Sequence, residues 1–263
     1  MAETSVALEQ DGLGITERRD AWWVGPFLTV LGLTTFIVYS TWAAFQGDHY
    51  LYLQGGAYYL SPFYSPNIEE MFGLRLPFSF AFAILWVPAG FRATCYYYRK
   101  AYYRSYFMDP LACAVGEPAG RRYHGEMSFP FILQNVHRYF FYLAVIVLGF
   151  LWYDTTRAFF FTNPATGRLE FGIGIGTLAL LVNVITLSGF SFGCNSLRHL
   201  IGGKLDCFTC SASARTRYQL WKGVSILNLK HMEWAWISLF AVGFADVYVR
   251  MCSMGVWTDL RLF

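Results

Sequence analysis

The sequence predicts an all-α integral membrane protein, a bundle of five transmembrane helices with the N-terminus in the cytoplasm and the C-terminus outside. Of its 263 residues, 56% are hydrophobic and only 14% are charged, whereas soluble domains carry about 25% charged residues. Five apolar segments are each long enough to cross about 30 Å of hydrocarbon, which takes about 20 residues. Basic residues gather in two of the four connections, and this bias marks cytoplasmic loops.

The five segments and their connections set the expected topology. We place the membrane helices near Trp22–Phe45, Leu76–Tyr98, Tyr139–Phe161, Phe171–Cys194 and Met232–Val249. The first connection is rich in Gly, Pro and Tyr and nearly free of Lys and Arg. The basic residues of the second and fourth connections are Arg99, Lys100, Arg104, Arg121, Arg122, Arg198, Lys204, Arg215, Arg217, Lys222 and Lys230. These two connections are therefore predicted to be cytoplasmic.

The sequence indicates one membrane domain and no separate soluble domain. Residues 1–21 are polar and lack the pattern of a secretory signal, so we interpret them as a retained cytoplasmic tail. Residues 22–263 form the transmembrane domain, with basic cytoplasmic loops near 99–130 and 199–230 that are too short for an independent core. Such loops could face anionic lipid headgroups or an acidic soluble partner. Most of the six cysteines fall on the cytoplasmic side, so we expect no disulfides.

Four polar residues are predicted to share one level at the cytoplasmic boundary. Cys95 lies about 29 Å along the second helix at 1.5 Å per residue, and Cys194 ends the fourth helix. His137 precedes the third helix and His231 precedes the fifth. Each residue alone is more often structural, because a boundary His forms hydrogen bonds and a buried Cys behaves as a small hydrophobe. Together they are a ligand set for zinc or for a Rieske-type [2Fe-2S] cluster.

Several other residues are also candidate ligands. His199 follows Cys194 by five residues, and Cys207 and Cys210 form a Cys-x-x-Cys spacing without a second pair; any of the three could replace one of the four. The basic loop adds Cys113 and His124 as weaker candidates, whereas Cys252 and His49 lie on the outer side and are interpreted as structural. Bis-histidine haem b is the rival chemistry. It needs paired histidines on facing helices, and two axial ligands could come from His137, His199 and His231. The helix interiors contain no histidine, which argues against a second haem across the membrane.

The strings around these residues resemble a known family. FRATCYYYRKAYYRSY, NVHRYFFYLA, CNSLRHLIGG and LNLKHMEWAWISLF are similar to the single-chain membrane anchor of one bacterial class of succinate dehydrogenase/fumarate reductase. The resemblance runs from about Pro26 to Leu262. It implies a five-helix anchor in the bacterial cytoplasmic membrane, on which a flavoprotein and an iron–sulfur subunit dock. It also implies a membrane-embedded Rieske-type cluster without haem, with Cys95, His137, Cys194 and His231 as the best-matching ligands.

The expected function is electron transfer from the iron–sulfur subunit through the cluster to a membrane quinone, menaquinone or ubiquinone. Succinate chemistry belongs to the partner subunits, because this chain has no nucleotide-binding fingerprint. We expect lipid and quinone as further partners and no nucleic acid. Arg92 and Tyr98 lie three residues on either side of Cys95, which places them on its helical face as candidate quinone contacts. An Arg92 side chain that extends to the lipid headgroups is the competing interpretation, and a haem b-binding anchor of a fumarate reductase or related quinone oxidoreductase is the alternative function.

Overall fold

The computed structural model describes residues 12–73, 77–118, 127–129 and 131–263. Residues 1–11 of the predicted tail lie outside this range, as do Arg121, Arg122 and His124 of the basic loop and Leu76, the predicted start of the second helix. The chain divides into two compact units, residues 1–35 with 93–135 and residues 36–92 with 136–263. Each unit is described by itself.

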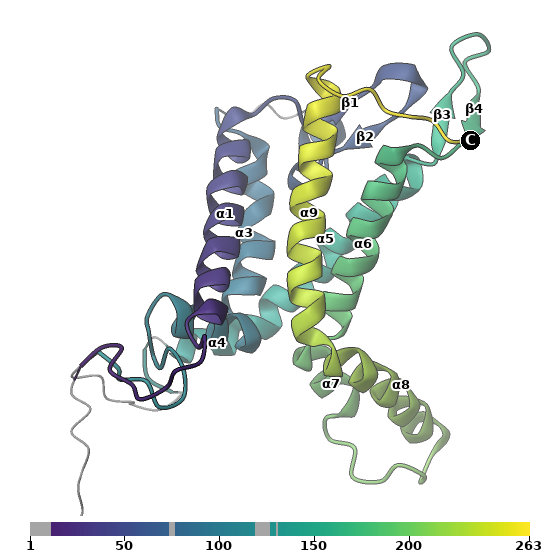
Figure 1. Cartoon of the computed structure of the whole chain (residues 1–263). Helices are drawn as coiled ribbons and strands as arrows, with labels where there is room; N and C mark the ends of the chain where they lie inside the picture. The colour runs from purple at the N-terminus through teal and green to yellow at the C-terminus, as the bar shows by residue number, and fades with distance from the viewer. Residues whose placement is uncertain (1–11, 74–76, 119–126, 130) are drawn as a thin grey trace, which may run out of the picture. The chain divides into compact units, whose positions relative to one another are not determined.

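Helices make up most of the described chain, and short strands and turns connect them (Figure 1). In chain order the elements are α1 (Val24–Gln46), β1 (Leu51–Tyr52), the 3-10 turn η1 (Gln54–Gly56), β2 (Tyr59–Leu60), η2 (Pro62–Tyr64), α2 (Ile68–Phe72), α3 (Phe80–Ala93), α4 (Tyr96–Ser105), η3 (Phe131–Val136), α5 (His137–Arg157), β3 (Phe160–Thr162), β4 (Leu169–Phe171), α6 (Ile175–Phe192), α7 (Asn195–Gly202), α8 (Ala212–Leu229) and α9 (His231–Ser253).

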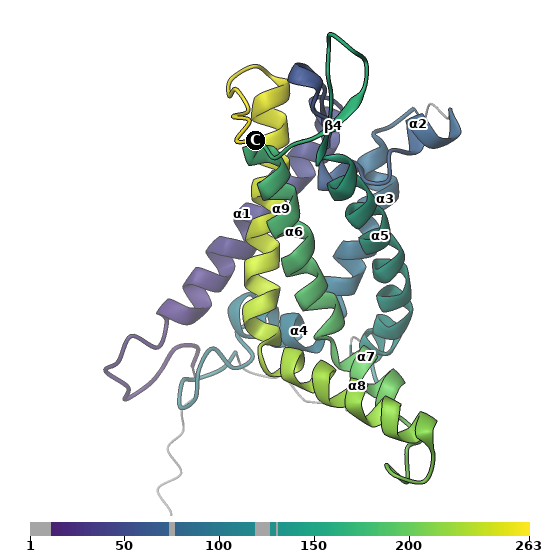
Figure 2. The ribbon, with the colours of Figure 1, turned by 90° about the vertical axis from the view of Figure 1, so that its right-hand side faces the viewer.

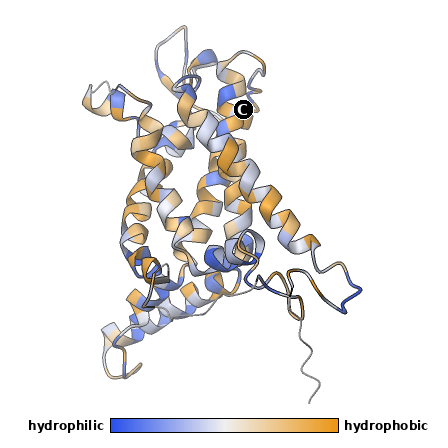
Figure 3. Ribbon diagram, turned by 90° about the vertical axis from the view of Figure 1, so that its left-hand side faces the viewer, coloured by the Kyte–Doolittle hydropathy of each residue, from blue (hydrophilic) through white to orange (hydrophobic). Residues whose placement is uncertain are grey.

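Within the part of the chain that the structure describes, four helical segments are long and apolar enough to cross a membrane: Val24–Gln46, Ile132–Arg157, Ile175–Phe192 and His231–Ser253. Hydrophobic residues dominate these helices, as the hydropathy colouring shows (Figure 3). The prediction of a helical membrane protein is therefore confirmed. The predicted second helix differs, because α3 covers only 14 residues, or about 21 Å at 1.5 Å per residue. It ends at Ala93, and α4 begins three residues later.

The second unit is built on α5, α6 and α9, and α6 packs along α9 (Figures 1 and 2). Both short hairpins, β1–β2 and β3–β4, lie at the end where α9 finishes, and α7 and α8 lie at the end where α9 begins. At the end of the unit that carries the hairpins, Asp259 links the chain after α9 to α6 and to α9. Its Oδ1 accepts hydrogen bonds from the Gly176 amide at 2.9 Å and from the Tyr248 hydroxyl at 2.7 Å. A carboxylate at the start of α6 satisfies amides that have no partner within the helix.

A buried ion pair lies inside the second unit. The side chains of Asp246 and Arg250 on α9 are 0% and 1% exposed, with 3.4 Å between Oδ2 and Nε. The Tyr39 hydroxyl donates to Asp246 at 2.5 Å, and the Ser61 hydroxyl donates to its other oxygen. The Nη1 of Arg250 donates to the Asp48 carbonyl at 2.9 Å. Each charge is thus compensated by a partner and by hydrogen bonds, as burial in a membrane requires.

The region predicted as the second cytoplasmic loop, 199–230, is largely helical. Arg217 donates from Nε to the Ile201 carbonyl at 2.9 Å and from Nη2 to the Gly203 carbonyl at 2.7 Å, which ties α8 to the end of α7. The Nε of Arg198 on α7 donates to the Ser225 hydroxyl on α8 at 3.1 Å. The Arg217 guanidinium thus stabilises carbonyls at the C-terminus of α7, and both arginines link α7 to α8.

In the first unit, the chain before α1 pairs with the loop that follows α4. The Gly14 amide donates to the Gly116 carbonyl at 3.0 Å, and the Gly116 amide donates to the Ile15 carbonyl at 2.8 Å. Thr16 and Arg18 add bonds to the carbonyls of Ala114 and Cys113. The described part of the predicted tail is therefore held by backbone hydrogen bonds.

Candidate functional site

Both candidate histidines occupy the first position of a membrane helix. His137 begins α5 and His231 begins α9. The ring of His137 stacks on Phe91 with centroids 4.8 Å apart, and that of His231 stacks on Phe190 at 5.0 Å. The two phenylalanines contact each other edge to face at 5.4 Å, and both are almost fully buried. A continuous row of four rings thus connects the two imidazoles.

Cys194 contacts the first of these histidines. Its Sγ lies 3.0 Å from the Nε2 of His137. Helix α6 ends at Phe192, and Cys194 adopts an extended conformation as the N-cap of α7, where Sγ accepts the Ser196 amide at 3.4 Å. Burial raises the pKa of the Cys194 thiol, and the Ser196 amide acts in the opposite direction. A soft metal bound here would displace that proton, since thiolate is the ligating form.

Cys95 occupies the same kind of position in the first unit. It is buried, adopts an extended conformation and forms the N-cap of α4. The prediction that one helix runs from Leu76 to Tyr98 is wrong, because the chain leaves the helical conformation between Ala93 and Tyr96. Both predicted cysteine ligands therefore occupy an extended N-cap position, and at Cys194 the Sγ accepts a cap hydrogen bond from the Ser196 amide.

The second unit therefore joins His137 to Cys194 and places His231 at the far end of the aromatic row. Among the described residues, no three His, Cys, Asp or Glu side chains gather closely enough to hold a metal ion. Cys95 belongs to the first unit, and its distance from the other three remains a prediction. The donor chemistry still fits a cluster with mixed ligands, because a thiol and an imidazole meet in a buried, aromatic environment.

The other candidates lie apart from this contact or are engaged elsewhere. His199 lies in the last turn of α7, where its Nδ1 is 3.3 Å from the Nη2 of Arg138. Cys207 and Cys210 are joined in a disulfide, contrary to the expectation of none. A three-residue separation brings their Cα atoms to 5.8 Å, which a disulfide spans without rearrangement. Cys113 is exposed in the first unit, and Cys252 is buried in the last turns of α9.

Arg92 points into the bundle. Its Nη1 donates to the Ala235 carbonyl at 3.0 Å and its Nη2 to the Ser238 hydroxyl at 2.9 Å. Its guanidinium also lies over the Phe190 ring, 4.6 Å from the centroid. Arg92 lies in the last turn of α3 whereas Tyr98 belongs to α4, so the two do not share one helical face with Cys95. Tyr98 is buried in the first unit, and its role stays a prediction.

A small apolar cavity of about 130 Å³ lies beside Arg92, between α1, α3, α5, α6 and α9. Phe91 and Phe190 form part of its wall, and Ser40 and Ser191 are among its few polar groups. No histidine belongs to the wall as the described residues form it. Phe91 and Phe190 thus lie between the two imidazoles and this cavity.

Sequence reasoning missed the residues that support the histidines. Ser238 and the Ala235 carbonyl hold Arg92, while Phe91 and Phe190 hold the imidazole rings. Trp234 packs closely against Gly189: a Cβ at position 189 would lie 2.6 Å from the indole ring. Its indole nitrogen is buried and meets no hydrogen-bond acceptor within the described ranges. The one available signal was spacing, because Trp234 follows His231 by three residues and so lies on the same helical face.

Comparison with known proteins decides the family. The sequence model described as "Actinobacterial succinate dehydrogenase subunit SdhC" matches residues 24–255. That range contains all four predicted ligands and both predicted quinone contacts.

The chain belongs to this family of succinate dehydrogenase subunits.

A solved structure supports the assignment. The chain is similar to a chain of the "Mycobacterium smegmatis Sdh1 complex in the apo form", with 42% sequence identity and a TM-score of 0.82. The similarity covers 94% of each chain. No curated protein matches. As a member of the SdhC family with several apolar helices, the chain is a multi-pass membrane subunit of a succinate dehydrogenase complex, and the expected membrane-anchor role is confirmed.

Proposed function

We propose that this SdhC chain passes electrons from an iron–sulfur subunit to a membrane quinone through a Rieske-type [2Fe-2S] cluster. Cys95, His137, Cys194 and His231 would hold the cluster. The observation that carries the proposal is the 3.0 Å contact between the Nε2 of His137 and the Sγ of Cys194. An imidazole and a thiolate are the two ligand types of Rieske centres.

The surroundings of this contact suit an electron carrier. A His-ligated [2Fe-2S] centre supplies one-electron transfer at potentials of roughly −150 to +300 mV, a range suited to handing electrons to a quinone. The chain's own residues orient the ligands, since Phe91 and Phe190 fix the planes of the two imidazoles. Stacking and buried neighbours of this kind control water access and ligand orientation at metal sites.

Arg92 is proposed to contact the quinone. Its guanidinium lines the apolar cavity and is held by Ala235 and Ser238, so it is already oriented before a ligand binds. A guanidinium donates to carbonyl oxygens without losing its charge. Reduction of a quinone to the quinol takes two electrons and two protons, and the partner's oxidation of succinate to fumarate releases the same number of each. Tyr98 is the second proposed contact.

The orientation and the partners complete the proposal. The N-terminus would be cytoplasmic and the C-terminus outside, in a bacterial cytoplasmic membrane, with α3 as a short fifth crossing element. A flavoprotein and an iron–sulfur subunit would dock on the cytoplasmic side. The exposed basic side chains that support this docking in the α7–α8 region are Lys204, Arg215, Lys222 and Lys230. Arg198 and Arg217 are engaged within the α7–α8 pair.

Low-temperature EPR on the purified complex tests the proposal. Dithionite-reduced samples should give a signal with average g near 1.9, typical of a His-ligated [2Fe-2S] centre, and it should disappear in His137→Ala and His231→Ala. Visible spectra of the same samples test the alternative anchor with haem b. A sharp reduced α-band with no such EPR signal would contradict the cluster and favour haem.

A further inference from the structure

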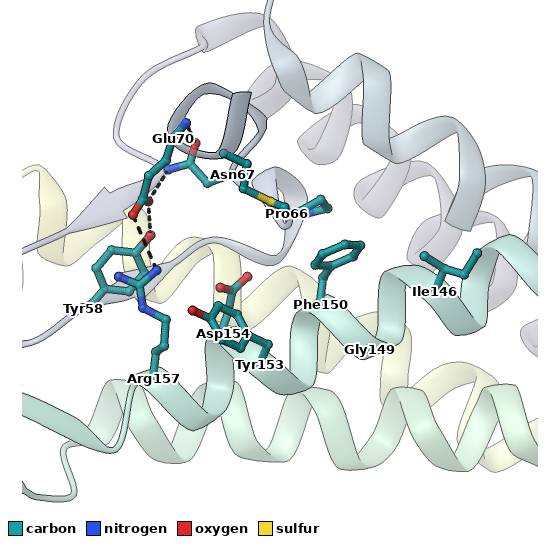
Figure 4. Close-up of a pocket in the computed structure, with 11 residues that line it drawn as sticks. Tyr58, Pro66, Asn67, Glu70, Ile146, Gly149, Phe150, Tyr153, Asp154 and Arg157 are labelled. Carbon is teal, nitrogen blue, oxygen red and sulfur yellow. Dashed lines mark hydrogen bonds and ion pairs between the residues drawn. The ribbon is translucent and has the colours of Figure 1, made fainter. Parts of the chain in front are cut away.

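We propose that a recess at the C-terminal end of α5 binds one phospholipid whose headgroup carries a primary ammonium, such as ethanolamine. The recess has a volume of about 630 Å³ and lies entirely in the second unit (Figure 4). One wall is the α5 surface from Ile146 to Arg157, and the other is formed by α2 and the turn before it. In the proposed orientation the site faces the outer leaflet, and in the opposite orientation the same residues would face the inner one.

The recess is graded from apolar to polar along α5. Ile146 and Phe150 lie at one end, and Asp154 and Arg157 at the other (Figure 4). The twelve residues from Ile146 to Arg157 are separated by eleven steps of 1.5 Å, or about 16 Å, close to the ~15 Å depth of hydrocarbon in one leaflet. A ligand with an apolar chain and a polar head fits this gradient.

Gly149 opens the apolar end. A Cβ placed on Gly149 would meet nothing within 4 Å beyond its own helix. Ile146 beside it is 58% exposed, and Met71 on α2 is 52% exposed. An acyl chain can therefore lie directly on the α5 backbone, where it would cover apolar side chains on both walls.

The polar end combines two carboxylates with one guanidinium. The Oε1 of Glu70 lies 3.6 Å from the Nη1 of Arg157, and Arg157 in turn stacks over the Tyr58 ring at 3.6 Å. Asp154 also lines the recess, and its Oδ2 accepts the Ser65 hydroxyl at 2.6 Å. The formal sum of these side-chain charges is one negative, which disfavours an anionic headgroup.

A zwitterionic headgroup with a primary ammonium matches this arrangement. Its ammonium would donate to Glu70 and Asp154, and its phosphate would accept from Arg157. The Tyr58 hydroxyl donates to Glu70 at 2.7 Å, and burial raises the Tyr58 pKa to about 12, so this hydroxyl stays protonated at neutral pH. A quaternary ammonium has no N–H to donate to these carboxylates. A quinone is neutral, so the excess negative charge of the recess would have no cation to balance it.

Native mass spectrometry on the delipidated complex tests the proposal, with phosphatidylethanolamine, phosphatidylcholine and phosphatidylglycerol of identical acyl chains titrated separately. Wild type should bind one more phosphatidylethanolamine per chain than Gly149→Leu at low lipid concentration. Gly25→Leu is the matched control, since Gly25 is also an exposed helical glycine with no atom within 4 Å of its Cβ position. It should bind as wild type does.

Glu70→Gln tests recognition of the headgroup separately from binding in the apolar part of the recess. It should weaken phosphatidylethanolamine binding about tenfold, the scale expected for one charge-assisted hydrogen bond, and leave phosphatidylcholine binding unchanged. Succinate–quinone activity should persist in all three variants and so report an intact complex. Equal ethanolamine-lipid binding by wild type and Gly149→Leu would overturn the proposal. So would a preference for phosphatidylglycerol, or loss of bound quinone in Gly149→Leu with no loss of lipid.

Discussion

The Nε2 of His137 lies 3.0 Å from the Sγ of Cys194, although 57 residues separate them in the chain. The contact forms because His137 begins α5 and Cys194 is the N-cap of the helix that follows α6, and these two helix ends lie at the same end of the second unit.

Cys194→Ser should abolish the EPR signal of the membrane cluster and lower the iron content of the complex. A serine hydroxyl is a poor replacement for a soft thiolate ligand. Succinate oxidation with a soluble dye should persist, because that chemistry belongs to the partner subunits. Cys252→Ser is the control, since Cys252 is equally buried near the other end of α9. Wild-type iron and signal in Cys194→Ser would remove Cys194 from the ligand set.

The double variant Cys207→Ser/Cys210→Ser should leave the EPR signal and quinone reduction unchanged. These two sulfurs are joined to each other, so neither supplies a thiolate in this state. Iron analysis and EPR of the double variant, compared with those of Cys194→Ser, check this prediction. Loss of the signal in the double variant would show that one of these cysteines replaces a proposed ligand.

Arg92→Lys should lower kcat/KM for quinone by about tenfold with no change in dye-coupled succinate oxidation. Lysine keeps the charge but cannot reproduce the planar fork that donates to both Ala235 and Ser238. Steady-state kinetics with a water-soluble quinone analogue measure the effect. Ser238→Ala removes only one of the two acceptors and should have a smaller effect. An unchanged kcat/KM in Arg92→Lys would contradict the proposed quinone contact.

Asp246→Asn should destabilise the complex by about 3–5 kcal/mol, because it leaves the buried Arg250 charge without its counter-ion. The double variant Asp246→Leu/Arg250→Met should recover part of this loss, since it removes both charges. Thermal unfolding of the complexes, followed by light scattering, ranks the variants by stability. Glu233→Gln is the control on the same helix, because its pair with Lys230 is exposed and contributes about 1 kcal/mol or less. Equal stability of Asp246→Asn and Glu233→Gln would show that the buried pair is not needed.

The membrane class of this protein was readable from the sequence, and so were the candidate metal ligands. Composition and apolar length predict membrane helices, because hydrocarbon demands about 20 apolar residues per crossing whatever the tertiary contacts are. Depth counting placed His137 and Cys194 at one level, and the structure brings them into contact. The family resemblance rested on short strings around these residues, and the match over residues 24–255 bears it out.

Only the tertiary structure decided where the helices break and what surrounds the histidines. No proline interrupts GFRATCYYYRK, yet α3 ends at Ala93 and Cys95 is the N-cap residue of α4. Hydropathy counts residues but carries no information on a local change of backbone angles. The stacking of Phe91 on His137 and of Phe190 on His231, and the bonds from Arg92 to α9, join segments 40 or more residues apart. Such pairings depend on how helix faces meet, which no periodicity within one segment encodes.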